Sequence, residues 1–225
     1  LCKNREDYLP EVISFRRKII EKKLNKKKTW KIQIIALSDD ELHEQRKYRW
    51  GDYWFKQEVE QELSAAGHKI VKDNPDILVH LFGAPVQNLP FEAYKVIWIH
   101  SHPDWINRKV LEKYDQIFSL SKKFIQKINA MGFSADHLVG ATAKKSIEAE
   151  NEFDIVFVGN ARSKTGRKII NDLGDLETFP YQLKIWGEGW KDILPEKFYG
   201  GLYYDNHNLD KLYASSVISL CDHHE

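Results

Sequence analysis

The sequence predicts an α/β protein made of two consecutive units, each built on a parallel sheet. Short apolar runs that are nearly continuous in Val, Ile, Leu and Phe are typical of strands buried on both faces. These runs alternate with amphipathic helical patterns, several of which end at a glycine, as expected for helices that cover both faces of a sheet. The alternation stops over residues 142–153, which show no apolar period, and then starts again. We therefore expect two Rossmann-like domains with parallel sheets.

Residues 1–29 are predicted to form a basic amphipathic helix and a linker. Over residues 10–24 apolar side chains recur at close to helical spacing with basic residues between them, and a proline at position 10 suits a first helical turn. Residues 1–31 carry a net charge of +7, which leaves −6 for the rest of the chain. A solvated face or a join to an upstream domain is favoured over a nucleic-acid site, because almost no aromatic residues are interleaved. Peripheral contact with anionic lipid is another interpretation of this helix.

Residues 30–147 are predicted to form the N-terminal Rossmann-like domain. Its apolar runs predict strands at 31–37, 68–71, 76–83, 94–101 and 115–121. Its helical patterns predict helices at 52–67, 107–114 and 122–132. The order of these elements is that of a doubly covered parallel sheet.

Residues 148–225 are predicted to form the C-terminal Rossmann-like domain. Strands are expected at 154–160, 181–187 and 217–221, and helices at 164–174 and 209–216. An α/β domain of this kind usually takes ~120–150 residues, so we expect this one to be incomplete.

Composition excludes several classes of protein. With 42% hydrophobic and 30% charged residues the chain is neither disordered nor fibrous, and no apolar run approaches the ~18 residues of a membrane span. Its two cysteines, Cys2 and Cys221, lie at opposite ends, which favours a reducing, cytoplasmic location over secretion. The sequence begins with Leu1, so we expect it to be part of a longer product with additional domains.

The segment from Val158 to Arg167 is the most informative one for chemistry. A strand is expected to end at Val158, Gly159 permits a tight turn, and Asn160, Arg162 and Lys164 follow with the first amides of a helix. Such an arrangement suits a phosphate. An ordinary loop with solvated bases is equally consistent with this stretch. A Walker loop is excluded because Ser163, not glycine, precedes Lys164, and GEGWKD at 187–192 has only two of the three glycines of a dinucleotide fingerprint.

Two further groups of residues are candidates for a site. His102 and Asp104 follow a buried strand, where they would act as general base and orienter, or would form a proline turn with Asp104 as a helix cap. His100 and His102 lack an identifiable third metal ligand, so no metal is expected. A second group lies at the end of the strand at 181–187 and consists of Trp186, Gly187, Gly189 and Trp190. These residues would form a flat surface for a base or sugar, or the tryptophans would pack in the core around a glycine turn.

The motifs together resemble a known family. Residues 154–225 contain, in order, FDIVFVGNARSKTGRKIINDL, LKIWGEGW and GGLYYDNHNLDKLYASSVISLCDHHE. The N-terminal half contains WGDYWFKQEVEQELSAAGH, VIWIHSHPDW and YDQIFSLSKKF. Over about residues 30–225 the chain resembles the CgeB-like (spore maturation protein-type) glycosyltransferases of the GT-B fold. It departs from the family by ending just before the acidic EGF-x-SNR segment that usually grips the donor sugar and ribose.

The resemblance implies two Rossmann-like domains facing a cleft, with the acceptor mainly on the first and a nucleotide-sugar donor mainly on the second. The donor would be a nucleoside-diphosphate sugar, which acts as a co-substrate. The resemblance implies no other cofactor and no catalytic metal. Carried over by position, Gly159, Asn160, Arg162 and Lys164 would line the diphosphate, and Trp186, Gly187, Gly189 and Trp190 would lie beside the base. Gly51 and Asp52 would form a glycine loop at the cleft, and His102 with Asp104 would face the acceptor.

These observations predict a metal-independent glycosyltransferase. It would move a sugar from a nucleotide-sugar donor to a hydroxyl of a glycan, lipid-linked or protein acceptor, and nucleic acid is not expected as a partner. Arg162 and Lys164 would hold the charge of the phosphorylated leaving group in place of a metal. The alternative is a non-catalytic GT-B-like scaffold or sugar-binding module of a larger multidomain protein. A sugar epimerase is disfavoured by the missing dinucleotide fingerprint.

Overall fold

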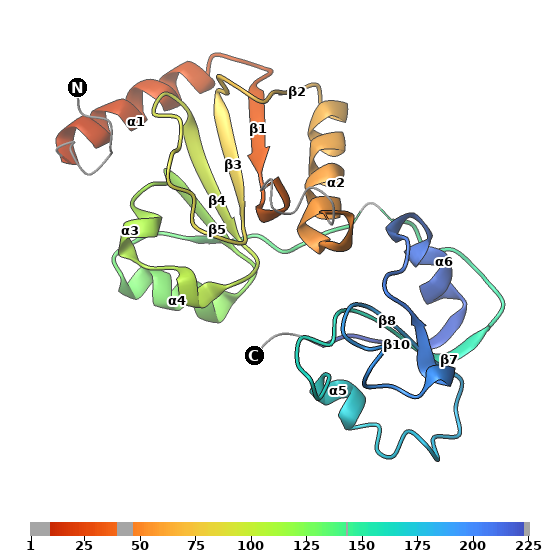
Figure 1. Ribbon diagram of the computed structural model, residues 1–225. Coiled ribbons are helices and arrows are strands. Elements are labelled where there is room, and N and C mark those ends of the chain that lie inside the picture. The colour runs from red at the N-terminus through yellow and green to blue at the C-terminus, as the bar shows by residue number, and fades with distance from the viewer. Residues whose placement is uncertain (1–9, 40–46, 143, 223–225) are drawn as a thin grey trace. The chain divides into compact units, whose positions relative to one another are not determined.

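The computed structural model describes residues 10–39, 47–142 and 144–222 of the chain. The chain divides into two compact units, Leu1–Thr142 and Ala143–Glu225, which are described one at a time. Each unit contains one sheet, and every pairing between strands in both sheets is parallel (Figure 1). The predicted α/β class with two parallel sheets is therefore confirmed.

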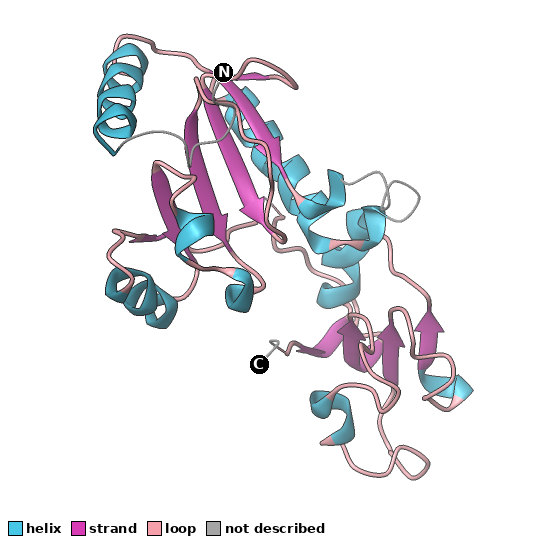
Figure 2. Cartoon of the chain, turned by 60° about the vertical axis from the view of Figure 1, so that its left-hand side comes forward, coloured by secondary structure: helices cyan, strands magenta, loops and turns pink. Residues whose placement is uncertain are grey.

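The first unit contains a sheet of six strands in the order β2-β1-β3-β4-β5-β6 (Figure 2). The strands are β1 (Lys31–Ile35), β2 (Lys69–Ile70), β3 (Ile77–Phe82), β4 (Tyr94–Ile99), β5 (Gln116–Ser119) and β6 (Asp136–His137). In the central register Ile34 is opposite Val79, which is opposite Val96. Because β2 lies on one side of β1 and all later strands lie on the other, the strand order reverses between β1 and β3. In open parallel sheets, ligands bind at the carboxyl ends of the strands beside such a reversal.

Helices cover both faces of this sheet. The α-helices of the first unit are α1 (Pro10–Leu24), α2 (Gly51–Ala65), α3 (Arg108–Leu111) and α4 (Lys122–Ala130). Short 3-10 turns lie at Leu37–Asp39, Lys47–Arg49 and Pro103–Trp105. Asn107 and Ser121 cap α3 and α4, since their side chains accept hydrogen bonds from the third residue beyond each of them. The helix expected at 107–114 is shorter than predicted, since α3 ends at Leu111.

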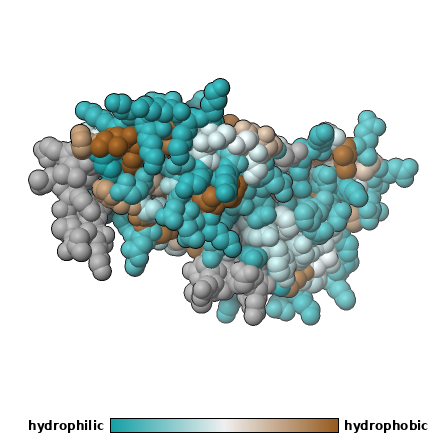
Figure 3. Space-filling view, turned by 90° about the horizontal axis from the view of Figure 1, so that it is seen from above, coloured by the Kyte–Doolittle hydropathy of each residue, from teal (hydrophilic) through white to brown (hydrophobic). Residues whose placement is uncertain are grey.

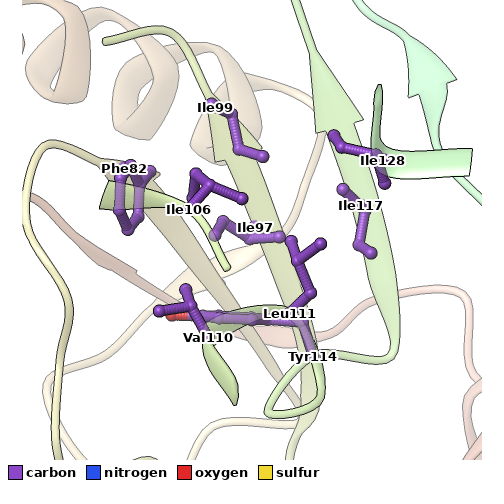
Figure 4. Packing of buried hydrophobic residues seen from close by; sticks show 9 residues of the cluster. All are labelled: Phe82, Ile97, Ile99, Ile106, Val110, Leu111, Tyr114, Ile117 and Ile128. Atoms are coloured by element: carbon purple, nitrogen blue, oxygen red, sulfur yellow. The ribbon is translucent and has the colours of Figure 1, made fainter. Parts of the chain in front are cut away.

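Apolar side chains fill the space between the sheet and the helices. On one face, residues of β4 and β5 such as Ile97 and Ile117 pack against Leu111 of α3 and Ile128 of α4 (Figure 4). On the other face, Ile32, Ile34 and Leu81 pack against one side of α2. The alternation of inward and outward side chains along β1 and β4 thus buries apolar residues on both faces.

Helix α1 is attached to the amino ends of β4 and β5 by a buried ion pair. Arg16, 7% exposed, donates to both carboxylate oxygens of Asp115 at 2.9 and 3.2 Å. It also donates to the carbonyl oxygens of Phe91 at 2.7 Å and Ala93 at 2.6 Å. Arg17 donates to the carbonyl of Asp115 at 2.6 Å. The expectation of a solvated basic face is therefore wrong for Arg16, which is a buried anchor.

The second unit contains a sheet of four strands in the order β10-β7-β8-β9. The strands are β7 (Phe153–Val158), β8 (Leu183–Trp186), β9 (Tyr199–Gly201) and β10 (Ser216–Leu220). The helices are α5 (Lys168–Asn171) and α6 (Leu209–Ala214), with 3-10 turns at Glu196–Phe198 and Asn206–Asn208. The strand order reverses between β7 and β10, so the carboxyl ends of these two strands are the expected ligand position.

Within the described residues, no helix is both long enough and apolar enough to cross a membrane.

Candidate functional site

In the second unit, the loop from Gly159 to Arg167 lies at the carboxyl end of β7, beside the reversal of strand order. The helix expected at 164–174 is wrong in its start, because α5 begins only at Lys168 and has four residues. The cause is a tight turn in which the Gly166 N–H donates to the Ser163 carbonyl at 3.2 Å. Gly166 has φ +77°, and a Cβ there would meet the Trp190 ring at 2.7 Å. Arg162 and Lys164 therefore lie on a loop and not at a helix end.

Gly159 and Asn160 join this loop to the loop that follows β8. The Gly159 N–H donates to the Trp186 carbonyl at 2.8 Å, and the Glu188 N–H donates to Asn160 Oδ1 at 2.9 Å. Gly187 is required at this junction, since its φ is +146° and a Cβ would lie 2.2 Å from the Gly159 oxygen. The side-chain oxygen of Asn160 thus holds the two loops together.

Arg162 is one of the basic side chains of this loop that remain available. It makes no hydrogen bond or ion pair with any residue that the structure describes. Its backbone is left-handed, at φ +63°, a conformation that costs energy for a residue with a Cβ and that is common at functional sites. Burial and the nearby charge of Arg167 lower the pKa of Arg162, and Asp222 opposes this shift. Arg162 is therefore within electrostatic reach of a second guanidinium and one carboxylate.

Arg167 and Asp222 connect the ends of β7 and β10, and sequence reasoning missed this pair. Arg167 donates to Asp222 and, through Nε, to the Asn160 carbonyl at 2.8 Å. With Arg162, the cluster contains two guanidinium groups and one carboxylate, and Lys164 is exposed nearby on the same loop. The excess of positive charge at this edge suits a bound anion. The signal for Arg167 was available, because it follows the same strand end as Arg162.

The structure gives packing positions to the two tryptophans proposed as a shelf for a base. Trp190 is fully buried in the core, where its Nε1–H donates to the Gly159 carbonyl at 2.6 Å. Trp186, 8% exposed, packs edge-on against Phe153 and Tyr204. Gly189, at φ +85°, continues the turn between them. These positions correspond to the core-packing interpretation of the motif.

In the first unit, Asp52 and Ser38 lie at the carboxyl end of β1, beside the reversal of strand order. The Ser38 N–H donates to Asp52 Oδ2 at 2.9 Å, which ties the turn after β1 to the first turn of α2. Gly51, the first residue of α2, has nothing within 4 Å of its Cβ position. Ser38 is 1% exposed, yet its Oγ has no hydrogen-bond partner among the described residues. A buried polar atom without a partner is uncommon and often marks a ligand or water position.

The histidines after β4 do not form the expected pair with Asp104. His102 is exposed, left-handed at φ +48°, stacked on Trp105 and hydrogen-bonded through Nδ1 to Ser101 Oγ at 3.1 Å. Asp104 is exposed and has no hydrogen bond with His102 among the described contacts. Nor does it cap a helix, because the cap of α3 is Asn107.

His100 is the better-placed imidazole at this edge, and sequence reasoning gave it no catalytic role. It is half-buried beside Phe55 of α2, and its buried Nε2 has no partner in the described part of the chain. Burial lowers the pKa of His100, the charge of Asp52 raises it, and His102 lowers it further. His100 is therefore neutral near pH 7, with a ring nitrogen free to accept or donate a hydrogen bond.

A buried histidine–tyrosine pair lies behind this edge. His80 Nδ1 lies 2.5 Å from the Tyr114 hydroxyl, and His80 is 1% exposed. Burial, together with the charge of His100, lowers the pKa of His80 to about 4, although a hydrogen bond with the Ala84 backbone opposes the shift. Burial also raises the pKa of Tyr114. Both groups are therefore neutral near pH 7 and serve as a polar contact within the core.

No group of three or more His, Cys, Asp or Glu side chains suited to a metal ion occurs in residues 10–39, 47–142 and 144–222. Comparison of the chain with protein-family models, with curated proteins and with solved structures finds no match. Function is therefore inferred from the residues and their geometry.

Proposed function

We propose that this chain is a glycosyltransferase that takes a sugar from a nucleoside-diphosphate sugar without a catalytic metal. The observation that carries the proposal is the Arg162 side chain, which has no partner among the described residues and is held in a left-handed backbone conformation at the carboxyl end of β7. Its position beside the reversal of strand order is where parallel sheets bind phosphorylated ligands. The resemblance to the CgeB-like GT-B enzymes supports the same position for the donor.

Arg162 and Lys164 would bind the diphosphate of the donor. A guanidinium can donate two parallel hydrogen bonds to phosphate oxygens, and an ammonium adds a mobile positive charge. When the bond between C1 of the sugar and the phosphate oxygen breaks, the electron pair remains on the diphosphate. Both cations would stabilise this developing charge. Arg167 would hold the loop through Asp222 and Asn160 without having to leave these partners.

The acceptor hydroxyl would bind at the first unit, next to Ser38 and His100. Its oxygen would form the new bond to C1, and its proton would pass to a base. The Nε2 of His100 has no partner among the described residues, and the lowered pKa leaves this imidazole unprotonated near pH 7. His100 therefore suits that role better than His102, whose ring is stacked on Trp105. The products are the glycosylated acceptor, the nucleoside diphosphate and a proton.

Binding of nucleotides to the Arg162→Ala/Lys164→Ala variant tests the proposal. Ligand-observed NMR against UDP, GDP, CMP and dTDP is expected to show saturable binding of one of them to the wild-type chain. The variant is expected to bind it about a hundredfold more weakly, as the loss of two charge-assisted contacts implies. The control variant Lys145→Ala/Lys211→Ala removes two exposed bases of the same unit outside the loop and is expected to bind like wild type. Equal affinity in the two variants would exclude the loop as the phosphate site.

A non-catalytic module is the second candidate. It is favoured by one observation, that the rings of Trp186 and Trp190 are buried and offer no surface for a base. A scaffold would bind none of the nucleotides above, so the same measurement separates the two candidates.

A further inference from the structure

The outer face of α1 combines exposed apolar and basic side chains. Phe15 and Ile19 are 66% and 53% exposed and lie four residues apart, on the same side of the helix. Lys18 and Lys22 are exposed beside them at helical spacing. We define the α1 outer face as Phe15, Lys18, Ile19, Lys22, Lys23 and the following Lys26, all of which are exposed. Figure 3 views the molecule of Figure 1 from above and shows apolar side chains among hydrophilic ones.

The inner face of α1 fixes this orientation. Ile20 and Leu24 are buried, and Arg16 is bound by Asp115 and two backbone carbonyls. A rotation of α1 that buried Phe15 would remove Arg16 from these partners, which is costly for a buried charge. The apolar side chains of the outer face therefore stay outside the apolar core of the first unit.

Among the side chains that the structure describes, acidic groups near the outer face are few. Glu21 is half-buried, and its charge acts on Tyr94 of the sheet. Asp76 accepts hydrogen bonds from Lys27 at 2.7 Å and from the Lys31 N–H at 2.9 Å. The lysines of the outer face thus present a net positive charge around two large apolar side chains.

We propose that the α1 outer face binds the anionic surface of a lipid bilayer, with Phe15 and Ile19 entering the headgroup boundary. A helix that carries Phe and Ile among several lysines has the composition of helices that lie in the interface plane. The lysines are attracted to the negative surface potential of anionic lipids, which a neutral protein partner would not provide. The face shares no residue with the phosphate loop, so this inference stands whether or not the proposed function is correct.

Co-sedimentation with vesicles tests the inference. The 225-residue chain is mixed with vesicles of phosphatidylcholine alone or of phosphatidylcholine with phosphatidylserine. We expect binding only where phosphatidylserine is present, and weaker binding at high salt. Phe15→Ser/Ile19→Ser is expected to weaken binding about a hundredfold, and Lys18→Gln/Lys22→Gln about twentyfold. All four residues are exposed, so thermal melts of both variants are expected to match wild type.

Two matched controls lie elsewhere on the first unit. Leu138→Ser/Val139→Ser removes two other exposed apolar side chains, and Lys122→Gln/Lys123→Gln removes two exposed lysines of α4. Both are expected to bind vesicles like wild type. Absence of vesicle binding, equal binding to both lipid compositions, or equal losses in the control variants would each overturn the proposal. A dimer in light scattering that Phe15→Ser/Ile19→Ser dissociates would assign the face to a second copy of the chain instead.

Discussion

The buried pair of Arg16 and Asp115 is predicted to be the main attachment of α1 to the first sheet. In the Asp115→Ala variant the Arg16 guanidinium, 7% exposed, loses a carboxylate that it contacts at 2.9 and 3.2 Å. Among the described residues it keeps the carbonyls of Phe91 and Ala93 as hydrogen-bond acceptors and the Phe91 ring as a contact. Removal of one partner of a buried ion pair costs about 3–5 kcal/mol, because the other charge stays buried without compensation. That is a fifth or more of the ~5–15 kcal/mol that stabilises a typical domain.

Hydrogen exchange measured by mass spectrometry separates this effect from changes elsewhere. The free energy of opening is read from peptides that cover β4 and β5, while peptides of the second unit serve as an internal reference. A double-mutant cycle of Asp115→Ala and Arg16→Ala is expected to give a coupling of at least about 1.5 kcal/mol. Lys22→Ala removes an exposed base of the same helix and is expected to change nothing in β4 or β5.

The result that would refute this reasoning is additivity. If the two single losses add to within about 0.5 kcal/mol of the double variant, the two side chains do not interact in solution.

Acid provides a second readout of the same pair. Burial alone would raise the pKa of Asp115, but hydrogen bonds from Arg16 and from the Lys95 N–H outweigh it and lower the pKa below its ordinary value of 3.8. The unfolded chain therefore binds this proton more readily than the folded one. The stabilisation from Asp115 is complete above that ordinary value and is lost as the pH falls through the lower, folded pKa. Asp115→Ala is expected to lack this acid-dependent loss.

Three further outcomes are predicted. Gly187→Ala places a Cβ 2.2 Å from the Gly159 oxygen. It is expected to lower the free energy of unfolding of the second unit, measured in urea, by about 2–4 kcal/mol. An unchanged urea midpoint would show that the two loops separate easily. His80, with its pKa lowered to about 4, is expected to make the first unit about 3 kcal/mol less stable at pH 4 than at pH 7, since the unfolded histidine binds a proton more readily; His80→Gln should remove this part of the pH dependence. Ser38→Ala is expected to leave stability within about 0.5 kcal/mol of wild type, because Ser38 Oγ has no partner among the described residues, yet to weaken acceptor binding; a large loss of stability would reveal a hidden partner.

Strands with continuous apolar runs could be predicted from the sequence because burial on both faces leaves a direct mark on composition. β3, β4 and β5 lie within their predicted ranges, and β7 begins at Phe153, one residue before its predicted range. β6 and β9 were missed because they have two and three residues and few apolar side chains. The start of α5 was misplaced because the chain makes a tight turn at Gly166, and Trp190 fills the space beside this glycine. Trp190 lies in a distant segment, so the sequence around Gly166 does not show the contact.

Contacts between distant segments also explain what was missed at the candidate site. Arg16 looked like any other base of a solvated helix, because its partner Asp115 lies 99 residues away. The composition of a single segment cannot show that Asn160 and Trp190 are used to join two loops. Ser38 and His100 become candidates only through the strand order and through the partners that their polar atoms lack among the described residues. The position of Arg162 after a strand, in contrast, was readable from the sequence.

The most direct test of the central claim is to map a bound nucleotide on the isotope-labelled chain by amide chemical shifts. Titration with the nucleoside diphosphate that binds is expected to shift the amides of residues 159–167 and 187–189, and Arg162→Ala is expected to require a higher nucleotide concentration for the same shifts. Saturable binding with shifts elsewhere in the chain, or an unchanged titration of Arg162→Ala, would contradict the assignment of the donor phosphate to this loop.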